Sequence, residues 1–351
     1  MIILINGTGD TVWLPVYTLN SDMDPLLLVL GSLELISYLI TGLLVLRTCK
    51  IIHKSRNFHQ NMNLLMIILI GQWFEAFFAK LLIMPYQVGF LKVINGSFIC
   101  WWTSDNEEMI KVSSFFSILP LFLPGMLIWH YVYSMFMGVT CVGVERIFAT
   151  IYVRDYEKTP RKYISITLLF LVHGISFPFS YFMTNNRINF IIADCLCIGC
   201  VILICPMYLS IWYINYRLGK KFAVPGCYRL AQQFQVKENI RHIMLARNIV
   251  CCATFFVAIA CGLLMIIVLD MIPTWLKNPL AHCVENCIFL NPLLICGTML
   301  LSVPPWKKEF IGSIPFLRKF RNEESRTGRD NLRPADETEV YFNQFKNAWM
   351  R

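Results

Sequence analysis

The sequence predicts an all-α membrane protein, a bundle of seven transmembrane helices with its N-terminus outside. Three observations support this fold class. Of the 351 residues, 56% are hydrophobic and only 15% are charged, whereas soluble domains carry about 25% charged residues. Seven apolar stretches are long enough to cross a bilayer, which takes about 20 residues. The Lys and Arg residues concentrate in every second connection between these stretches, as they do in cytoplasmic loops.

The apolar stretches define the expected spans. They are 26–46, 62–84, 114–144, 163–183, 190–216, 248–272 and 283–303. Segment 1–25 is then extracellular, 26–303 is the transmembrane domain, and 304–351 is a cytoplasmic tail. We expect no signal peptide, because the opening MIILI is too short for one and no basic segment precedes it.

Membrane topology follows from the loop charges. Four segments together hold 26 of the 31 Lys and Arg residues: 47–61, 146–163, 217–247 and 304–351. This bias places them in the cytoplasm and the N-terminus outside. Glycosylation sequons at Asn6 and Asn95 fall on the expected outer side. Because the basic residues lie in short loops between apolar stretches, the net charge of +9 indicates a lipid bilayer as partner and not nucleic acid.

A short amphipathic helix is expected directly after the last span. Trp306, Phe310 and Ile314 recur at i, i+4 and i+8, which places them on one helical face. Lys307 and Lys308 lie off that face. The pattern therefore predicts a helix that lies on the inner leaflet.

Several ionisable residues fall inside the expected spans. A charge that faces lipid is costly, so these side chains should face the bundle interior or a water-filled cavity. We take four as candidates for a ligand pocket among the outer halves of the helices: Glu75, Lys80, His130 and Asp194. The alternative is that they only join helices by hydrogen bonds. Intramembrane charges also motivate a transporter or channel as the alternative function, although seven spans do not divide into the two matched halves common in transporters.

Catalytic and metal sites are not expected. Cys195, Cys197 and Cys200 lie close together on one expected helix, but no His accompanies them, which disfavours a metal site. The sequence contains no phosphate-binding loop and no His-Glu-x-x-His motif. We therefore predict neither an enzyme nor a bound cofactor. Cys100, in a long outer loop, is a candidate for a disulfide whose partner the sequence leaves open.

Prolines inside the expected spans suggest hinges. A proline within a helix removes a backbone hydrogen bond and bends the helix. We take Pro206, Asn291 and Pro292 as candidate activation hinges; ordinary packing irregularity is the alternative. Asn291 would bond the carbonyl freed by Pro292 or a neighbouring helix.

The third span ends in a charged pair, Glu145-Arg146. An isolated pair of this kind would be interpreted as interfacial, with Arg146 extending toward lipid phosphate. The residues that follow are aromatic and charged in a fixed order: Phe148, Ala149, Tyr152, Asp155, Tyr156 and Glu157. This order resembles the nematode serpentine chemoreceptors of class epsilon, a family of seven-helix receptors of the G-protein-coupled type. Weaker matches at 13–17 and 238–241 extend the resemblance over about residues 13–310.

The resemblance implies a chemosensory receptor that binds an external small chemical and signals to a heterotrimeric G protein. Glu145, Arg146 and Tyr152 would then form the coupling site, with Arg146 lining an inner opening and Glu145 neutralising it in the closed state. Ile147 and Ile295 depart from the wider receptor pattern, which usually has Tyr at both places, so the detailed activation switch stays open. The implied location is the plasma membrane, including the sensory ciliary membrane of chemosensory neurons.

Overall fold

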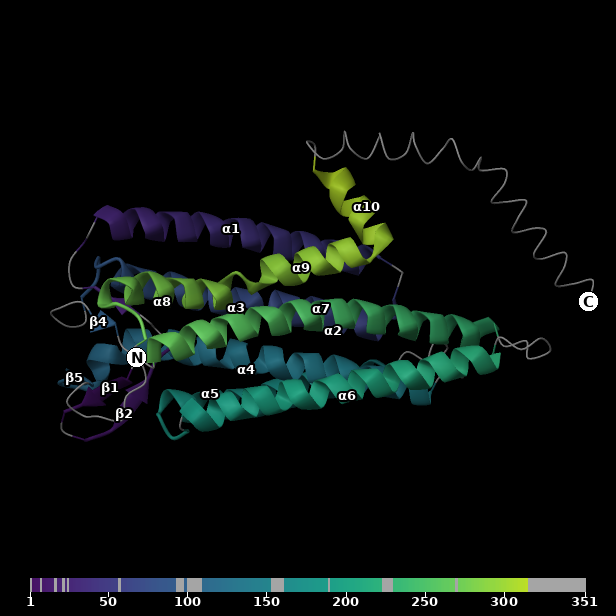
Figure 1. Cartoon of the computed structure of the whole chain (residues 1–351), viewed down its shortest axis with the longest axis horizontal. Coiled ribbons are helices and arrows are strands. Elements are labelled where there is room, and N and C mark those ends of the chain that lie inside the picture. Colours follow the sequence, from purple (N-terminus) through teal and green to yellow (C-terminus); the bar gives the residue numbers. More distant parts are fainter. Residues whose placement is uncertain are drawn as a thin grey trace, which may run out of the picture. The chain divides into compact units, whose positions relative to one another are not determined.

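The structure is a computed structural model of the whole chain (Figure 1). It describes residues 2–6, 8–15, 18–20, 23, 25–55, 58–92, 98–99, 109–152, 161–188, 190–222, 230–268 and 271–314. Two compact units divide the chain, Met1–Met299 and Leu300–Arg351. The described residues are mostly helical, as the sequence predicts.

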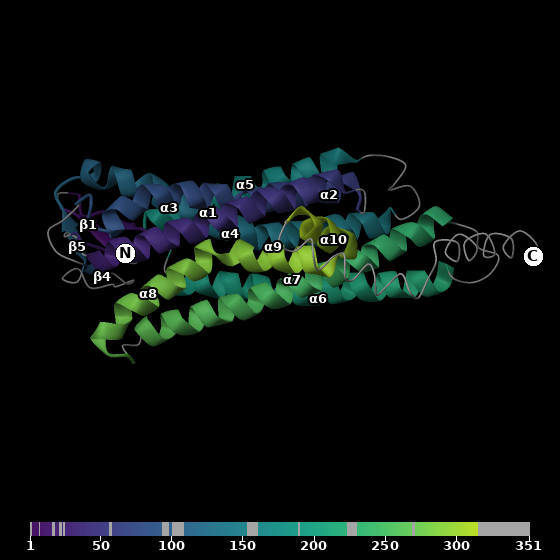
Figure 2. The same ribbon diagram turned by 90° about the horizontal axis from the view of Figure 1, so that it is seen from above.

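Helices make up most of the first unit. The helices of the described chain are α1 (Pro25–Lys54), α2 (Gln60–Gly71), α3 (Trp73–Gln87), α4 (Phe115–Ile151), α5 (Lys162–Thr184), α6 (Phe190–Phe222), α7 (Leu230–Val268), α8 (Thr274–Phe289), α9 (Asn291–Ser302) and α10 (Pro304–Ser313). Helices α1 to α8 run alongside one another (Figures 1 and 2). Helix α4 contacts α2, α3, α5, α6 and α7, so it is the central helix of the bundle.

Four helical stretches of described residues are long and apolar enough to cross a membrane. They are Pro25–Lys54, Gln60–Gln87, Phe115–Ile151 and Lys162–Thr184. The count becomes five when Leu280–Cys287 and Asn291–Ser302, bent by 43°, are taken as one span. Helices α6 and α7 have 33 and 39 residues, but many of their side chains lie outside the described part. The helical membrane class is confirmed, and the seven-span count stays a prediction.

At one end of the bundle, helices extend beyond the apolar stretches predicted as spans. Helix α4 continues to Ile151 instead of ending at 144, and α7 begins at Leu230 instead of 248. The expected basic loop at 217–247 is therefore largely helical. Hydropathy marks only the apolar part of a helix, whereas backbone hydrogen bonds continue through polar residues.

Small β-sheets form at the other end, where α1 begins and α5 ends (Figure 1). One sheet joins β1 (Ile2–Ile5), β2 (Thr11–Trp13) and β5 (Ile110–Val112) in the order β2-β1-β5. The other pairs β3 (Thr18–Leu19) with β4 (Phe98–Ile99). We call this the strand end, and the opposite end the far end. The all-α prediction missed these strands because β1 pairs in parallel with β5, which lies far away in the sequence.

The N-terminal segment, residues 2–6 and 8–15, packs onto the helices at the strand end. Ile2 and Trp13 share a hydrophobic cluster with Tyr133 of α4 and Met183 of α5. Trp129 Nε1 donates to the carbonyl oxygen of Trp13 at 3.3 Å, and the two indole rings lie 4.8 Å apart. This segment therefore covers the strand end of α4 and α5.

The second unit contains the predicted helix after the last span. Helix α10 begins with two prolines and ends at Ser313. Ile314 has an extended backbone, with φ −99° and ψ 114°, so it is not on the helical face that the sequence pattern predicts. The spacing from Trp306 to Phe310 fits the helix, and the third repeat does not.

Candidate functional site

An arginine–glutamate pair is buried near the far end of α4. Arg146 is 1% exposed and Glu145 is 0% exposed. Arg146 Nε donates to Glu145 Oε2 at 2.5 Å, and its Nη2 donates to Oε1 at 2.7 Å. Such paired, charge-assisted hydrogen bonds are stronger than neutral ones. The interfacial alternative, with Arg146 extended toward phosphate, is therefore wrong for this conformation.

Arg146 also links α4 to two other helices. Its Nη1 donates to Asn239 Oδ1 on α7 at 3.0 Å, and Asn239 Nδ2 donates to Asn215 Oδ1 on α6 at 3.0 Å. Asn215 Nδ2 donates to Thr150 Oγ1 at 2.9 Å, and Thr150 Oγ1 donates to the Arg146 carbonyl oxygen at 2.8 Å. We call Glu145, Arg146, Thr150, Asn215 and Asn239 the arginine network. It holds the far ends of α4, α6 and α7 together.

Tyr152 lies outside this network. It caps the C-terminal end of α4 and is 39% exposed. The Arg161 guanidinium lies 4.3 Å from the centre of its ring, within the range of a cation–π contact. Tyr152 therefore belongs to the surface next to the buried pair.

Close packing of α4 on α6 continues from the arginine network into the bundle. A Cβ added at Gly143 would clash with the terminal methyl group of Met207. One turn further, Tyr208 on α6 donates its hydroxyl to the Val139 carbonyl oxygen at 3.0 Å. The Gly143–Met207 contact and this hydrogen bond both show that α4 packs closely on α6 here.

A cavity of about 330 Å³ lies beside this contact, between α2, α4, α6, α7, α8 and α9. That volume is within the usual range of about 300–1,000 Å³ for small-molecule sites. Its wall includes Tyr131, Val142, Tyr208 and His242. Among the described residues that line it, none is Asp, Glu, Lys or Arg.

The break between α8 and α9 borders the same cavity. Asn291 lines the cavity and is the first residue of α9. The Tyr131 hydroxyl donates to Asn291 Oδ1 at 2.9 Å, so Asn291 bonds the neighbouring helix α4, one of its two expected partners. Pro292 follows the break, whereas Pro206 lies inside α6, which continues past it. A helix break therefore accompanies Pro292, whereas the helix around Pro206 is continuous.

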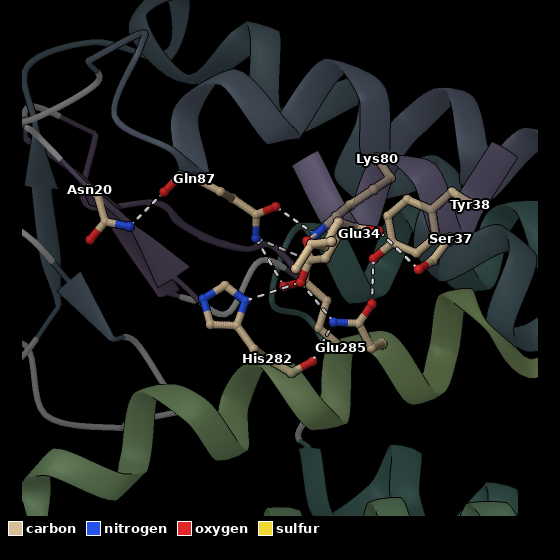
Figure 3. A network of polar contacts seen from close by, with 10 residues as sticks. Asn20, Glu34, Ser37, Tyr38, Lys80, Gln87, His282 and Glu285 are labelled. Carbon is tan, nitrogen blue, oxygen red and sulfur yellow. Dashed lines mark hydrogen bonds and ion pairs between the residues drawn. The ribbon is translucent and has the colours of Figure 1, made fainter. Parts of the chain in front are cut away.

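A second polar network surrounds Lys80 toward the strand end (Figure 3). Lys80 is 0% exposed and Glu285 is 1% exposed. Lys80 Nζ lies 2.7 Å from Glu285 Oε1 and 3.7 Å from Glu34 Oε2, and it donates to Gln87 Oε1 at 2.6 Å. Gln87 Nε2 lies 3.0 Å from both oxygens of Glu285. A buried ion pair therefore connects α3 to α8.

Glu34 extends this network to α1. Glu34 Oε1 accepts from Asn286 Nδ2 at 2.7 Å, and the Tyr38 hydroxyl donates to Asn286 Oδ1 at 2.7 Å. His282 Nδ1 lies 3.5 Å from the same Glu34 oxygen. We call this group the lysine network: Glu34, Tyr38, Lys80, Gln87, His282, Glu285 and Asn286. It joins α1, α3 and α8 through two carboxylates and one ammonium.

Glu75, His130 and His173 form a third contact between helices. Glu75 Oε1 on α3 lies 2.7 Å from His130 Nδ1 on α4, and His130 Nε2 lies 3.4 Å from His173 Nδ1 on α5. Glu75 and Lys80 therefore have different partners, although both belong to α3. Within the described part of the chain, no three His, Cys, Asp or Glu side chains converge as a metal site requires.

Comparison with known proteins identifies the chain. The model of the family described as Sre G protein-coupled chemoreceptor matches residues 1–350. The chain belongs to this family. It is 36% identical to serpentine receptor class epsilon-38 of Caenorhabditis elegans over 99% of the chain and 100% of the relative. It is 33% identical to class epsilon-37 and 30% identical to class epsilon-31 of the same organism, over 99% or more of each chain.

Membership of the Sre family confirms the resemblance and the prediction that the chain is not an enzyme. It makes the chain a membrane chemoreceptor and does not favour a transporter or channel. The family name does not by itself assign a role to any residue. The roles of Glu145, Arg146 and Tyr152 in coupling therefore stay predictions.

The three described pocket candidates of this Sre receptor do not line the cavity. Glu75, Lys80 and His130 instead contact other polar side chains between helices, which is the alternative that the sequence left open. The Asp194 side chain and Asn95 lie outside the described residues. Asn6 is described and exposed.

Sequence reasoning missed several partners in both networks. Asn239 entered only as part of the short match at 238–241, and Asn215 and Glu285 were not singled out. Glu285 was detectable, because it is a carboxylate inside an expected span. No sequence signal connects Asn215 with Asn239, since their contact depends on how α6 and α7 pack.

Proposed function

We propose that the chain is a seven-span plasma-membrane chemoreceptor that binds an external small chemical and couples to a cytoplasmic heterotrimeric G protein. The observation that carries the proposal is the burial of Arg146 between Glu145 and Asn239. This cation closes the far end of the bundle by joining α4 to α7. Membership of the Sre chemoreceptor family supports the receptor role.

The proposed topology places the strand end outside and the far end in the cytoplasm. Segment 1–25 is extracellular, 26–303 spans the membrane, and 304–351 is the cytoplasmic tail. The charge bias of the loops supports this orientation, and Asn6 is exposed at the strand end. Helices α6, α7 and the bent pair α8–α9 supply the three spans beyond α1, α2–α3, α4 and α5.

The proposed mechanism is a shift between two populations. In the closed state, Asn239 keeps α7 against α4. A ligand that binds better to the open state shifts the population toward it. Opening separates Asn239 from Arg146 and exposes the guanidinium beside Tyr152. A helix of the G protein then enters the opening, as amphipathic helices bind apolar grooves.

The break at Asn291-Pro292 supplies a hinge for this movement. The Tyr131–Asn291 hydrogen bond fixes the break against α4, so a shift of α4 also acts on α9. Pro206 is a weaker hinge in this proposal, because α6 continues through it. The proposed hinge residue Asn291 also lines the cavity.

The test measures ligand-free activity, so it needs no known ligand. Purified receptor is reconstituted with G-protein heterotrimers, and the rate of guanine-nucleotide exchange is followed. Asn239→Ala should raise the basal rate, because it removes the contact of Arg146 with α7. The expected bias is about 1–3 kcal/mol, the usual size of a coupling free energy. When Arg146→Ala is added to Asn239→Ala, the double variant should no longer show the raised basal rate.

Asn185→Ala is the matched control, because Asn185 lies at the strand end and its side-chain amide donates to the Tyr181 carbonyl of its own helix. It should leave the basal rate unchanged. An unchanged rate in Asn239→Ala, or normal exchange in Arg146→Ala and Arg146→Lys at matched receptor amounts, would remove the arginine network from the mechanism.

A further inference from the structure

The cavity between α2, α4 and α7 has a wall that selects a chemical class. It is lined mainly by aliphatic, aromatic and sulfur-containing side chains. Four methionines contribute: Met62, Met66, Met135 and Met299. Methionine has a flexible and polarisable side chain that adapts to different shapes. Such a wall is suited to apolar molecules of varied outline.

The charges of the bundle face other partners. Lys80 is within 2.7 Å of Glu285, and Arg146 is bonded to Glu145. No Asp, Glu, Lys or Arg side chain belongs to the described cavity wall. A charged ligand would lose its hydration there without gaining a counterion, which is strongly unfavourable. The described wall therefore disfavours charged ligands, carboxylates and ammonium compounds alike, although it includes the imidazole of His242.

A few polar side chains border the cavity and have oxygen atoms that can accept a hydrogen bond from a ligand. The Tyr131–Asn291 pair and Tyr208 border the cavity. Pockets of this kind combine an apolar wall with a small number of polar groups that fix the orientation of the ligand. A ligand with one hydroxyl, amine or carbonyl group, uncharged at neutral pH, fits this description.

The volume of the cavity limits the size of the ligand. A cavity of about 150 Å³ lined by apolar residues binds one benzene. The cavity of about 330 Å³ is roughly twice as large. We propose that it is a binding site for a neutral, apolar molecule of two to three rings, or an aliphatic molecule of similar volume.

The position of the cavity gives such a ligand a route to signalling. Val142 lines the cavity and lies one helical turn from Arg146 on α4. His242 lines it and lies about one turn from Asn239 on α7. An occupant that presses on both residues acts on the Arg146–Asn239 contact. This consequence rests on the proposed function, whereas binding itself does not.

The test uses 1-aminoanthracene, a neutral three-ring dye that fluoresces more strongly in apolar surroundings. The receptor is purified in lipid nanodiscs, and empty nanodiscs give the signal from dye in lipid. Wild-type receptor should show additional, saturable fluorescence. Anthracene-9-carboxylate, a charged molecule of similar size, should not displace the dye. Effective displacement by the carboxylate would overturn the assignment of a neutral ligand.

A matched pair of substitutions locates the bound dye. Ala253 lines the cavity, whereas Cys251 is exposed on the same helix and does not. Ala253→Phe should weaken dye binding by at least about tenfold, since even one methylene changes binding in an apolar pocket by about 10–200-fold. Cys251→Phe should leave it unchanged. Equal binding by both variants would show that the dye binds elsewhere.

A widening substitution covers the case in which Ala253→Phe does not fold. Met135→Ala enlarges the cavity and should favour the larger pyrene over 1-aminoanthracene, relative to wild type. An unchanged preference would overturn the assignment. These binding results do not depend on G-protein coupling. Loss of dye binding in Ala253→Phe supports the cavity as the binding site even where nucleotide exchange is absent. Retained binding in that variant overturns it even where exchange is normal.

Discussion

The lysine network and the arginine network solve the problem of buried charge in different ways. In the lysine network, the ion pair itself crosses between helices, from Lys80 on α3 to Glu285 on α8. In the arginine network, the ion pair is local, because Glu145 and Arg146 are neighbours on α4. Arg146 also donates to the neutral Asn239 on α7.

This difference decides which contact can open. Separation of α3 from α8 would leave Lys80 and Glu285 as uncompensated buried charges, which is strongly unfavourable. Separation of α7 from α4 leaves Arg146 still paired with Glu145. We infer that the lysine network is a fixed clamp and that the arginine network is the part of the bundle able to switch.

Membrane topology gives the largest expected effect in this comparison. If the arginine network couples to a G protein, the far end of the bundle has to face the cytoplasm. A tag at residue 351 should be reached by antibody only after cells are permeabilised. Asn6 should be glycosylated, and Asn6→Gln should remove the corresponding shift in gel mobility. Labelling of the tag on intact cells would place the arginine network outside and contradict the proposal.

Removal of Lys80 should give the largest loss of stability. Lys80→Met leaves Glu285 buried without its cation, and loss of one partner of a buried pair costs about 3–5 kcal/mol. Thermal unfolding of the purified receptor measures the effect. The double variant Lys80→Met/Glu285→Met should recover much of the stability, because it removes the unpaired charge as well.

Lys111→Met is the control for that experiment, because Lys111 is exposed on β5. It should change the unfolding temperature little. If Lys80→Met were as stable as Lys111→Met, the lysine network would not be a clamp.

Changes in the arginine network should affect signalling more than stability. Glu145→Gln removes the carboxylate that neutralises Arg146 and should raise ligand-free signalling by a bias of about 1–3 kcal/mol. Arg146→Lys keeps the charge but loses the planar fork of donors, so it should reach the surface and signal weakly. Second-messenger output at matched surface expression measures both. Basal output from Glu145→Gln equal to that of wild type would show that this carboxylate does not hold the closed state.

The smallest expected effect concerns the hinge. Tyr131→Phe removes the hydrogen bond to Asn291 and keeps the ring, so it should destabilise the receptor by about 0.5–1.5 kcal/mol. It should also shift basal nucleotide exchange, because the bond fixes the break between α8 and α9. Tyr181→Phe is a suitable control, since Tyr181 is 50% exposed at the strand end. Identical exchange in the two variants would argue against a hinge at Asn291.

Local features of the site were predictable and their partners were not. The pair Glu145-Arg146 stood out because two charges end an apolar stretch. Asn291-Pro292 stood out because a proline inside an expected span removes a backbone hydrogen bond and bends or breaks the helix. The ligand pocket was predicted around Glu75, Lys80 and His130 on the assumption that buried charge marks a binding site. Those charges are instead used between helices, and the cavity has an apolar wall that no sequence pattern distinguishes from the core.

The sequence by itself determined the membrane class and the approximate positions of the helices, and it predicts the orientation. These properties follow from hydropathy, proline and loop charge, which act locally along the chain. Only the tertiary structure decided that Arg146 contacts Asn239, that Lys80 contacts Glu285 and that β1 pairs with β5. Each of these contacts joins residues far apart in the sequence, so it depends on how whole helices and strands pack, which the local pattern of side chains does not specify.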